Sequence, residues 1–183
     1  TEPRGLKVVD MSNPRSAAVV ANVPLPLQAS PMYVMASGTL VYVADDRGAV
    51  HIVDASAPRN ARILWSLNVG WIVGSMSKSG DLFAAGTDAG VYLYDIPDDR
   101  IGQPELLSHI DFSDESGPGL KEVLAVGNRL YVSFGDVFPY PGRVVNVDLT
   151  DPTSPYSLEW LAVPGGGVWL RPTYRNGVIF WLT

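Results

Sequence analysis

Short apolar runs, separated by Gly, Pro, Asp and Ser, recur along the whole chain of 183 residues. No stretch sustains the i, i+3, i+4, i+7 apolar spacing of a helix, so the runs are predicted to be strands. In the first complete cycle they occupy 32–36, 40–44, 50–54 and 62–67, with a hairpin-type turn at 45–48. Two further cycles follow the same order, at 71–76, 82–85, 91–95 and 106–110, then at 122–126, 130–134, 144–148 and 158–163.

One phrase returns four times at the end of the third strand of each cycle, and its aspartate is the constant feature. The aspartates are spaced by 44, 41 and 53 residues, and they are Asp10, Asp54, Asp95 and Asp148. Each can accept a hydrogen bond from the N–H two residues later, which builds an Asx turn. We therefore give all four a structural turn role and no catalytic or metal-binding role.

A β-rich repeat of this period is typical of propeller blades. The chain begins with a third and a fourth strand, at 6–10 and 19–23, and finishes with a first and a second, at 168–171 and 178–182. The predicted fold is an all-β β-propeller with about four blades' worth of four-stranded antiparallel sheets and one blade split between the termini. The blades fall at about 29–67, 70–110, 120–163, and 168–183 plus 5–23, in a single propeller domain or arc over 1–183.

Three closures of the split blade stay open: within one chain, by exchange between two chains, or with blades outside this sequence. The first residue is Thr1 rather than Met, so we expect a processed product or a piece of a longer protein. An unpaired ribbon would expose a strand edge, so some closure is expected.

Composition excludes several classes of function. The net charge is −6 and no Lys/Arg cluster occurs, so nucleic-acid binding is not expected. No apolar run reaches the length of a membrane span, and the absence of Cys removes disulfides, thiolate chemistry and Cys-ligated metals. The histidines, His51 and His109, lack metal-ligand spacing and are expected to be framework residues, and neither a catalytic serine motif nor a cofactor site is found.

The phrase Leu6–Pro14, and the stretch from Val41 to Pro58, resemble the LVIVD-repeat family of bacterial and archaeal β-propellers. The resemblance is recognisable again at 144–155. It is weaker at 91–99, where Pro97 takes the place of the serine and the turn must be built differently. The resemblance implies a propeller without an assigned reaction, in an exported or cell-surface protein. Its expected role is interaction with a protein partner or assembly into a homo-oligomer.

The third blade departs most from the repeat, through longer connections at 111–119 and 135–142. Both should emerge on the same face of a propeller, where carboxylates beside aromatic side chains would suit a protein, a peptide, a cation or a sugar. The candidate binding residues are Asp111, Asp114, Glu115, Asp136, Phe138 and Tyr140.

Two alternative functions remain at this point. A propeller enzyme, or the scaffold half of one, would carry its active site at the central opening or on other blades, with Lys121, Glu122 and Arg171 able to approach that opening. A carbohydrate-binding propeller would use tryptophans for stacking, although their recurrence at matching blade positions favours packing between blades.

Overall fold

The computed structural model describes residues 4–26, 29–98, 102–112, 122–134, 143–162 and 173–180. Strands dominate, and no α-helix occurs in these ranges. Within them, no helix has the length and apolar character to cross a membrane. The chain forms two compact units, one of Thr1–Ile72 with 98–100 and one of Val73–Pro97 with 101–183.

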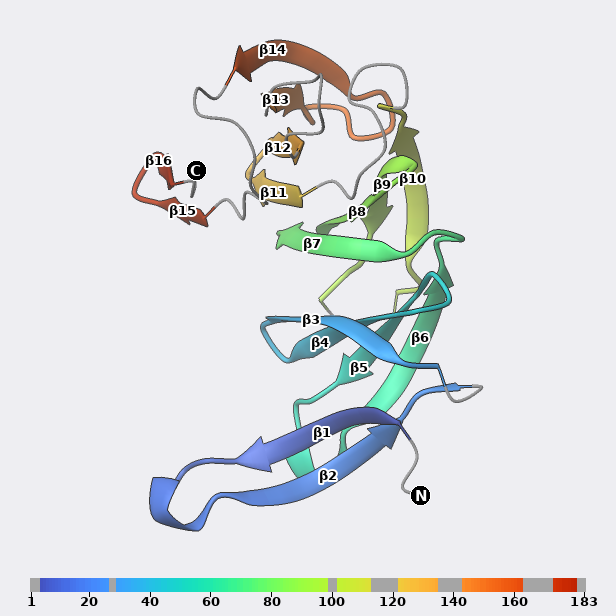
Figure 1. Ribbon diagram of the computed structural model, residues 1–183, viewed down its shortest axis with the longest axis vertical. Helices are drawn as coiled ribbons and strands as arrows, with labels where there is room; N and C mark the ends of the chain where they lie inside the picture. The colour runs from blue at the N-terminus through green and yellow to red at the C-terminus, as the bar shows by residue number, and fades with distance from the viewer. Residues whose placement is uncertain are drawn as a thin grey trace. The chain divides into compact units, whose positions relative to one another are not determined.

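The first unit holds a two-stranded ribbon and a four-stranded sheet (Figure 1). A 3-10 turn, η1 (Pro14–Ser16), connects the two strands of the ribbon. A second 3-10 turn, η3 (Pro58–Asn60), connects the last two strands of the sheet. The ribbon strands are β1 (Gly5–Asp10) and β2 (Ala18–Pro24), and the sheet strands are β3 (Pro31–Ser37), β4 (Leu40–Asp45), β5 (Ala49–Asp54) and β6 (Arg62–Asn68).

The second unit holds two four-stranded sheets and a short ribbon. One sheet consists of β7 (Val73–Ser79), β8 (Leu82–Thr87), β9 (Gly90–Asp95) and β10 (Glu105–Ile110). The other consists of β11 (Glu122–Val126), β12 (Arg129–Phe134), β13 (Arg143–Asp148) and β14 (Tyr156–Ala162), and the ribbon of β15 (Thr173–Arg175) and β16 (Val178–Phe180).

Every sheet is an antiparallel meander whose strands pair in chain order. This is the blade of a β-propeller, and the predicted fold class is confirmed. The first strand of the second cycle starts at Val73 rather than at Trp71, because Trp71 and Ile72 belong to the connection before it. The ribbons β1–β2 and β15–β16 are separate sheets in different units, so the closure of the split blade stays a prediction.

The fourth strand of each cycle contains a β-bulge at the same place. One residue there has no partner in the register, and it is always a large aliphatic residue: Val20, Leu64, Leu107 and Leu158. A bulge adds one residue to one strand and shifts every later pair by one position. The bulge therefore decides which side chains of the fourth strand face the third strand's side chains.

Apolar side chains pack between neighbouring sheets within each unit. In the first unit, Val23 of the ribbon and Leu25, which follows the ribbon, pack with Val43 and Val53 of the sheet. In the second unit, a larger core joins residues of the two sheets, among them Leu93, Val123, Val132, Phe134 and Val147. These interfaces bury the face that a single blade could not cover alone.

A row of serines links the two sheets of the second unit. The hydroxyl oxygens of Ser75, Ser77 and Ser79 on β7 accept hydrogen bonds from backbone N–H groups at 3.1, 2.9 and 2.9 Å. The donors belong to alternate residues along the next sheet's first strand and its turn, Val123, Ala125 and Gly127. Side chains thus replace the backbone pairing that two inner strands of different blades do not make.

Candidate functional site

A buried series of hydrogen-bonded polar side chains, called the polar chain below, stabilises the turn between β4 and β5. Asp45 Oδ1 accepts the N–H groups of Arg47 and Ala49, each at 2.9 Å. Asp45 Oδ2 lies 3.0 Å from His51 Nε2, and His51 Nδ1 lies 2.8 Å from Ser66 Oγ. Asp45 and His51 are each 2% exposed, whereas Ser66 lies on the outer strand β6 and is exposed.

The hydrogen-bond roles in this chain follow from the chemistry of the groups. An ionised carboxylate only accepts, so the ring nitrogen facing Asp45 carries the proton. In the neutral imidazole the other nitrogen then accepts from the hydroxyl of Ser66. The order Ser–His–Asp is that of a catalytic triad, and the same register positions in the other sheets show whether it is catalytic or structural.

The second sheet fills these positions with Thr87, Tyr92 and His109. Thr87 Oγ1 accepts from the N–H of Ala89 at 3.1 Å and donates to the carbonyl of Gly90 at 2.9 Å. His109 pairs with Tyr92 in the register, stacks on its ring with centroids 4.2 Å apart, and places Nε2 3.1 Å from the carbonyl of Ala89.

The third sheet fills the same positions with Phe134, Val145 and Trp160. The rings of Phe134 and Trp160 stack with centroids 5.8 Å apart, and the guanidinium of Arg143 lies 4.9 Å from the Trp160 ring. Three different chemistries therefore do one task, which is to hold the outer strand against the strands that precede it. Because aromatic packing substitutes for the polar chain, Asp45–His51–Ser66 is best explained as a framework device.

The Asx turn of the repeated phrase forms at three of the four aspartates. The Oδ1 atoms of Asp10, Asp54 and Asp148 accept the N–H two residues later at 2.9, 2.9 and 2.7 Å. The residue two positions after Asp95 is Pro97, which has no N–H to donate. The N–H of Ile96 still donates to the carbonyl of Asp81 at 2.8 Å, as the matching N–H groups of Ala55 and Leu149 do at 2.9 Å in the other sheets.

These turn bonds favour the charged carboxylate. The N–H of Ser12 lowers the pKa of Asp10 below its ordinary value, and nearby Arg59 adds a smaller lowering. The hydroxyl and the N–H of Thr150 do the same for the pKa of Asp148. Both aspartates are thus ionised at neutral pH, as their structural role requires.

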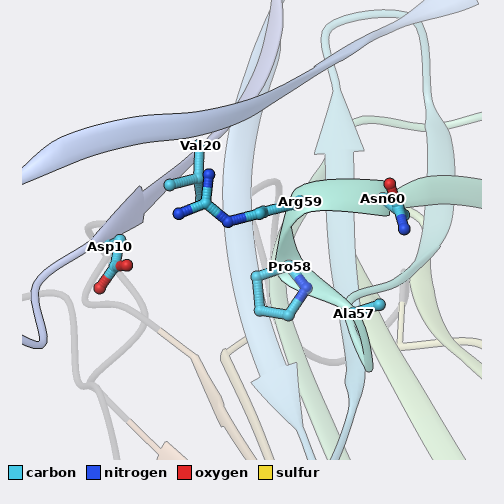
Figure 2. Close-up of a pocket in the computed structure, with 6 residues that line it drawn as sticks. All are labelled: Asp10, Val20, Ala57, Pro58, Arg59 and Asn60. Carbon is cyan, nitrogen blue, oxygen red and sulfur yellow. The ribbon is translucent and has the colours of Figure 1, made fainter.

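A groove of about 440 Å³ lies where the ribbon meets the turn after β5 (Figure 2). Its walls come from two successive copies of the repeated phrase, and the side chain of Arg59 extends towards Val20. The lining residues are Asp10, Val20, Ala57, Pro58, Arg59 and Asn60. The groove thus combines an apolar wall, one carboxylate, one guanidinium and one amide.

Comparison with known families identifies the repeat. The model of the LVIVD repeat matches residues 2–24 and 30–65. The match lies within the first 65 residues of the chain. Comparison with curated proteins gives no match.

Solved structures show the same fold at low sequence identity. Saccharomyces cerevisiae Sqt1 is 14% identical over 85% of this chain and 43% of its own, with a TM-score of 0.60. The computationally designed Ika4 protein is 14% identical over 87% of this chain and 89% of its own, also at 0.60. Citrobacter koseri AztD is 13% identical over 88% and 42%, at 0.54. The chain therefore spans less than half of Sqt1 and of AztD.

The two matched LVIVD segments contain the whole groove, and the second holds Asp45 and His51. Of the predicted binding residues, the structure places Asp111 on the surface directly after β10. The others, Asp114, Glu115, Asp136, Phe138 and Tyr140, lie outside the described residues. Across the described ranges, no three His, Asp or Glu side chains gather as a possible metal site.

Sequence reasoning did not find the groove or the Asp45–His51–Ser66 chain. The groove has a sequence signal in the fourth strands, where Val20-Ala21 stands in place of Leu107-Ser108. This difference between the two strands can be recognised only after their β-bulges, which the structure provides, have been aligned.

Proposed function

We propose that these LVIVD repeats form a protein-interaction or assembly module, without a reaction of its own, in an exported or cell-surface protein. The observation that carries the proposal is the outer strand β14. Among the residues that the structure describes, β14 is the edge strand of its sheet, and its large apolar side chains are exposed. The exposed fractions are 58% for Tyr156, 40% for Leu158, 38% for Trp160 and 58% for Leu161.

Apolar side chains concentrated on one exposed strand are characteristic of a protein-binding surface. An edge strand also offers unpaired backbone N–H and C=O groups, to which a partner strand can add. Trp160 is less suited to stacking on a sugar, because Phe134 and Arg143 already lie against its ring. These features favour a protein partner over a carbohydrate.

The non-enzymatic part of the proposal is supported by the framework role of the polar chain. A triad needs its serine to be free for attack and oxyanion donors beside it. Ser66 instead sits within β6, opposite His51 in the register, at a position that the other sheets fill with His109 and Trp160. We therefore expect no turnover that depends on Ser66.

The test uses the full chain as an immobilised bait for exported proteins and for free copies of itself. The double variant Tyr156→Lys/Leu161→Lys is compared with Leu106→Lys, which alters a 53% exposed leucine on the outer strand of the neighbouring sheet. We expect saturable binding that weakens roughly tenfold or more in the double variant and is unchanged in the control.

Two results would overturn the proposal. One is the absence of saturable binding to any exported protein or to the chain itself. The other is turnover of an ester or glycoside panel that disappears in Ser66→Ala while the fold, followed by circular dichroism, is intact.

A further inference from the structure

The junction between β10 and the turn after β13 is closed by two side chains. Ser108 Oγ donates a hydrogen bond to the carbonyl of Pro152 at 2.7 Å. The bulge residue before it, Leu107, packs against the core between the two sheets. In the second unit, the preceding blade therefore covers the following blade's Pro turn.

The corresponding junction of the first unit lacks both contacts. The aligned bulges place Val20 where the second unit has Leu107, and Ala21 where it has Ser108. Pro58 corresponds to Pro152, because each follows its phrase aspartate by four residues. Valine is one carbon shorter than leucine, and alanine has no hydroxyl to donate. A groove of about 440 Å³ lies at this junction, and that volume falls in the range of ligand-binding pockets.

Arg59 is the group in the groove with which an anion could pair, and Asp10 balances its charge in the lining. Arg59 replaces Thr153 of the other junction, and no ion pair or hydrogen bond of its side chain occurs among the described residues. A guanidinium presents a planar fork that matches a carboxylate. Residues 1–72 carry six Lys/Arg and five Asp/Glu, whereas residues 73–183 carry seven and fourteen. The groove thus lies in the less acidic part of an acidic chain.

We propose that this groove binds a segment of a partner protein that carries a carboxylate next to a hydroxyl. The carboxylate pairs with Arg59, and the hydroxyl donates to the carbonyl of Pro58, as Ser108 does to Pro152 in the second unit. This site deepens the proposed interaction role and rests on it. Asp10 favours a monoanionic carboxylate over a dianionic phosphate, because its own charge lies on the same groove wall.

The test titrates the ¹⁵N-labelled full chain with a capped peptide, acetyl-Gly-Ser-Glu-Gly-amide, followed by NMR. We expect saturable shifts of the backbone N–H signals of Ala57, Arg59 and Asn60. A peptide with Gln in place of Glu should bind at least about tenfold more weakly, since it cannot form the charged pair. A peptide with phosphoserine in place of Ser-Glu should also bind more weakly.

Two variants and one control examine the site itself. Val20→Leu/Ala21→Ser copies the closed junction, so it should fold at least as stably as the parent chain while losing the peptide. Arg59→Gln should weaken binding about tenfold or more, whereas Arg15→Gln should not. Arg15 holds the same position in η1 and does not line the groove.

Several results would overturn the groove proposal: no saturable shifts, equal binding of the Gln peptide, tighter binding of the phosphopeptide, or full binding by Val20→Leu/Ala21→Ser. If any of these occurs while the bait experiment still shows binding that depends on β14, the interaction function stands and the groove site fails. If the bait experiment also finds no partner, the interaction function fails as well.

Discussion

Removing the carboxylate of Asp45 should destabilise the first unit more than any other single change in its turns. Asp45→Ala takes the acceptor away from three donors, the N–H groups of Arg47 and Ala49 and the ring N–H of His51. A buried donor left without a partner costs about 1–3 kcal/mol. Water can reach the two turn N–H groups more easily than the ring, so the total loss should be roughly 3–5 kcal/mol.

That loss is large against a typical domain stability of about 5–15 kcal/mol. Asp45→Asn keeps one carbonyl oxygen for the two N–H groups and should lose only about 1–2 kcal/mol. Asp46→Ala is the matched control in the same turn. Asp46 is exposed and accepts one hydrogen bond, from the N–H of Ser30 at 2.9 Å, so its removal should cost less than about 1 kcal/mol.

The assay is urea unfolding followed by tryptophan fluorescence, with Trp65 and Trp71 reporting on the first unit. The free energies are comparable only if the slope of the transition is the same in parent and variants. Equal losses for Asp45→Ala and Asp46→Ala, within about 0.5 kcal/mol, would refute the reasoning that the buried chain holds the turn.

Three further predictions follow from the same contacts. Ser77→Ala should cost about 1–3 kcal/mol in urea unfolding, because a buried N–H of β11 loses its acceptor. Ser79→Ala should cost less, because its donor, the N–H of Gly127, belongs to an exposed residue. Gly48→Ala should lower the melting temperature more than Gly38→Ala: both have positive φ, but a Cβ at Gly48 would lie 2.7 Å from a backbone nitrogen, whereas Gly38 faces open space. The lowered pKa of Asp148 stabilises the fold at pH values above the ordinary carboxyl pKa of about 3.9. This stabilisation is lost as the pH falls through the lowered pKa. Asp148→Asn should therefore flatten the acid limb of unfolding followed by circular dichroism.

Local chemistry explains why the strands and their turns were predictable. The Asx turns at Asp10 and Asp148 involve atoms two residues apart, and the hairpin at Asp45 is set by four consecutive residues. Because these contacts are local, a repeated sequence motif predicts them directly. Alternation of apolar residues then gives the strands between the turns.

The buried chain was not predictable, because it depends on register between strands. Starting from the pair Asp54 and Arg62, an unbroken antiparallel register would place His51 opposite Trp65. The bulge at Leu64 shifts the pairing by one residue and places Ser66 there instead. A one-residue shift exchanges the two faces of a strand, so counting along the sequence selects the wrong partner.

The bulge also determines where binding sites can arise in this architecture. Each junction described within a unit pairs a bulged outer strand with the Pro turn of the following blade. Leu107 and Ser108 supply the cover and the donor at one junction, and Val20 and Ala21 leave the other open. The Asx turn that precedes the Pro is the same in both cases. Two side chains can therefore decide whether the outer strand covers the Pro turn at a junction, without an insertion that would interrupt the repeat.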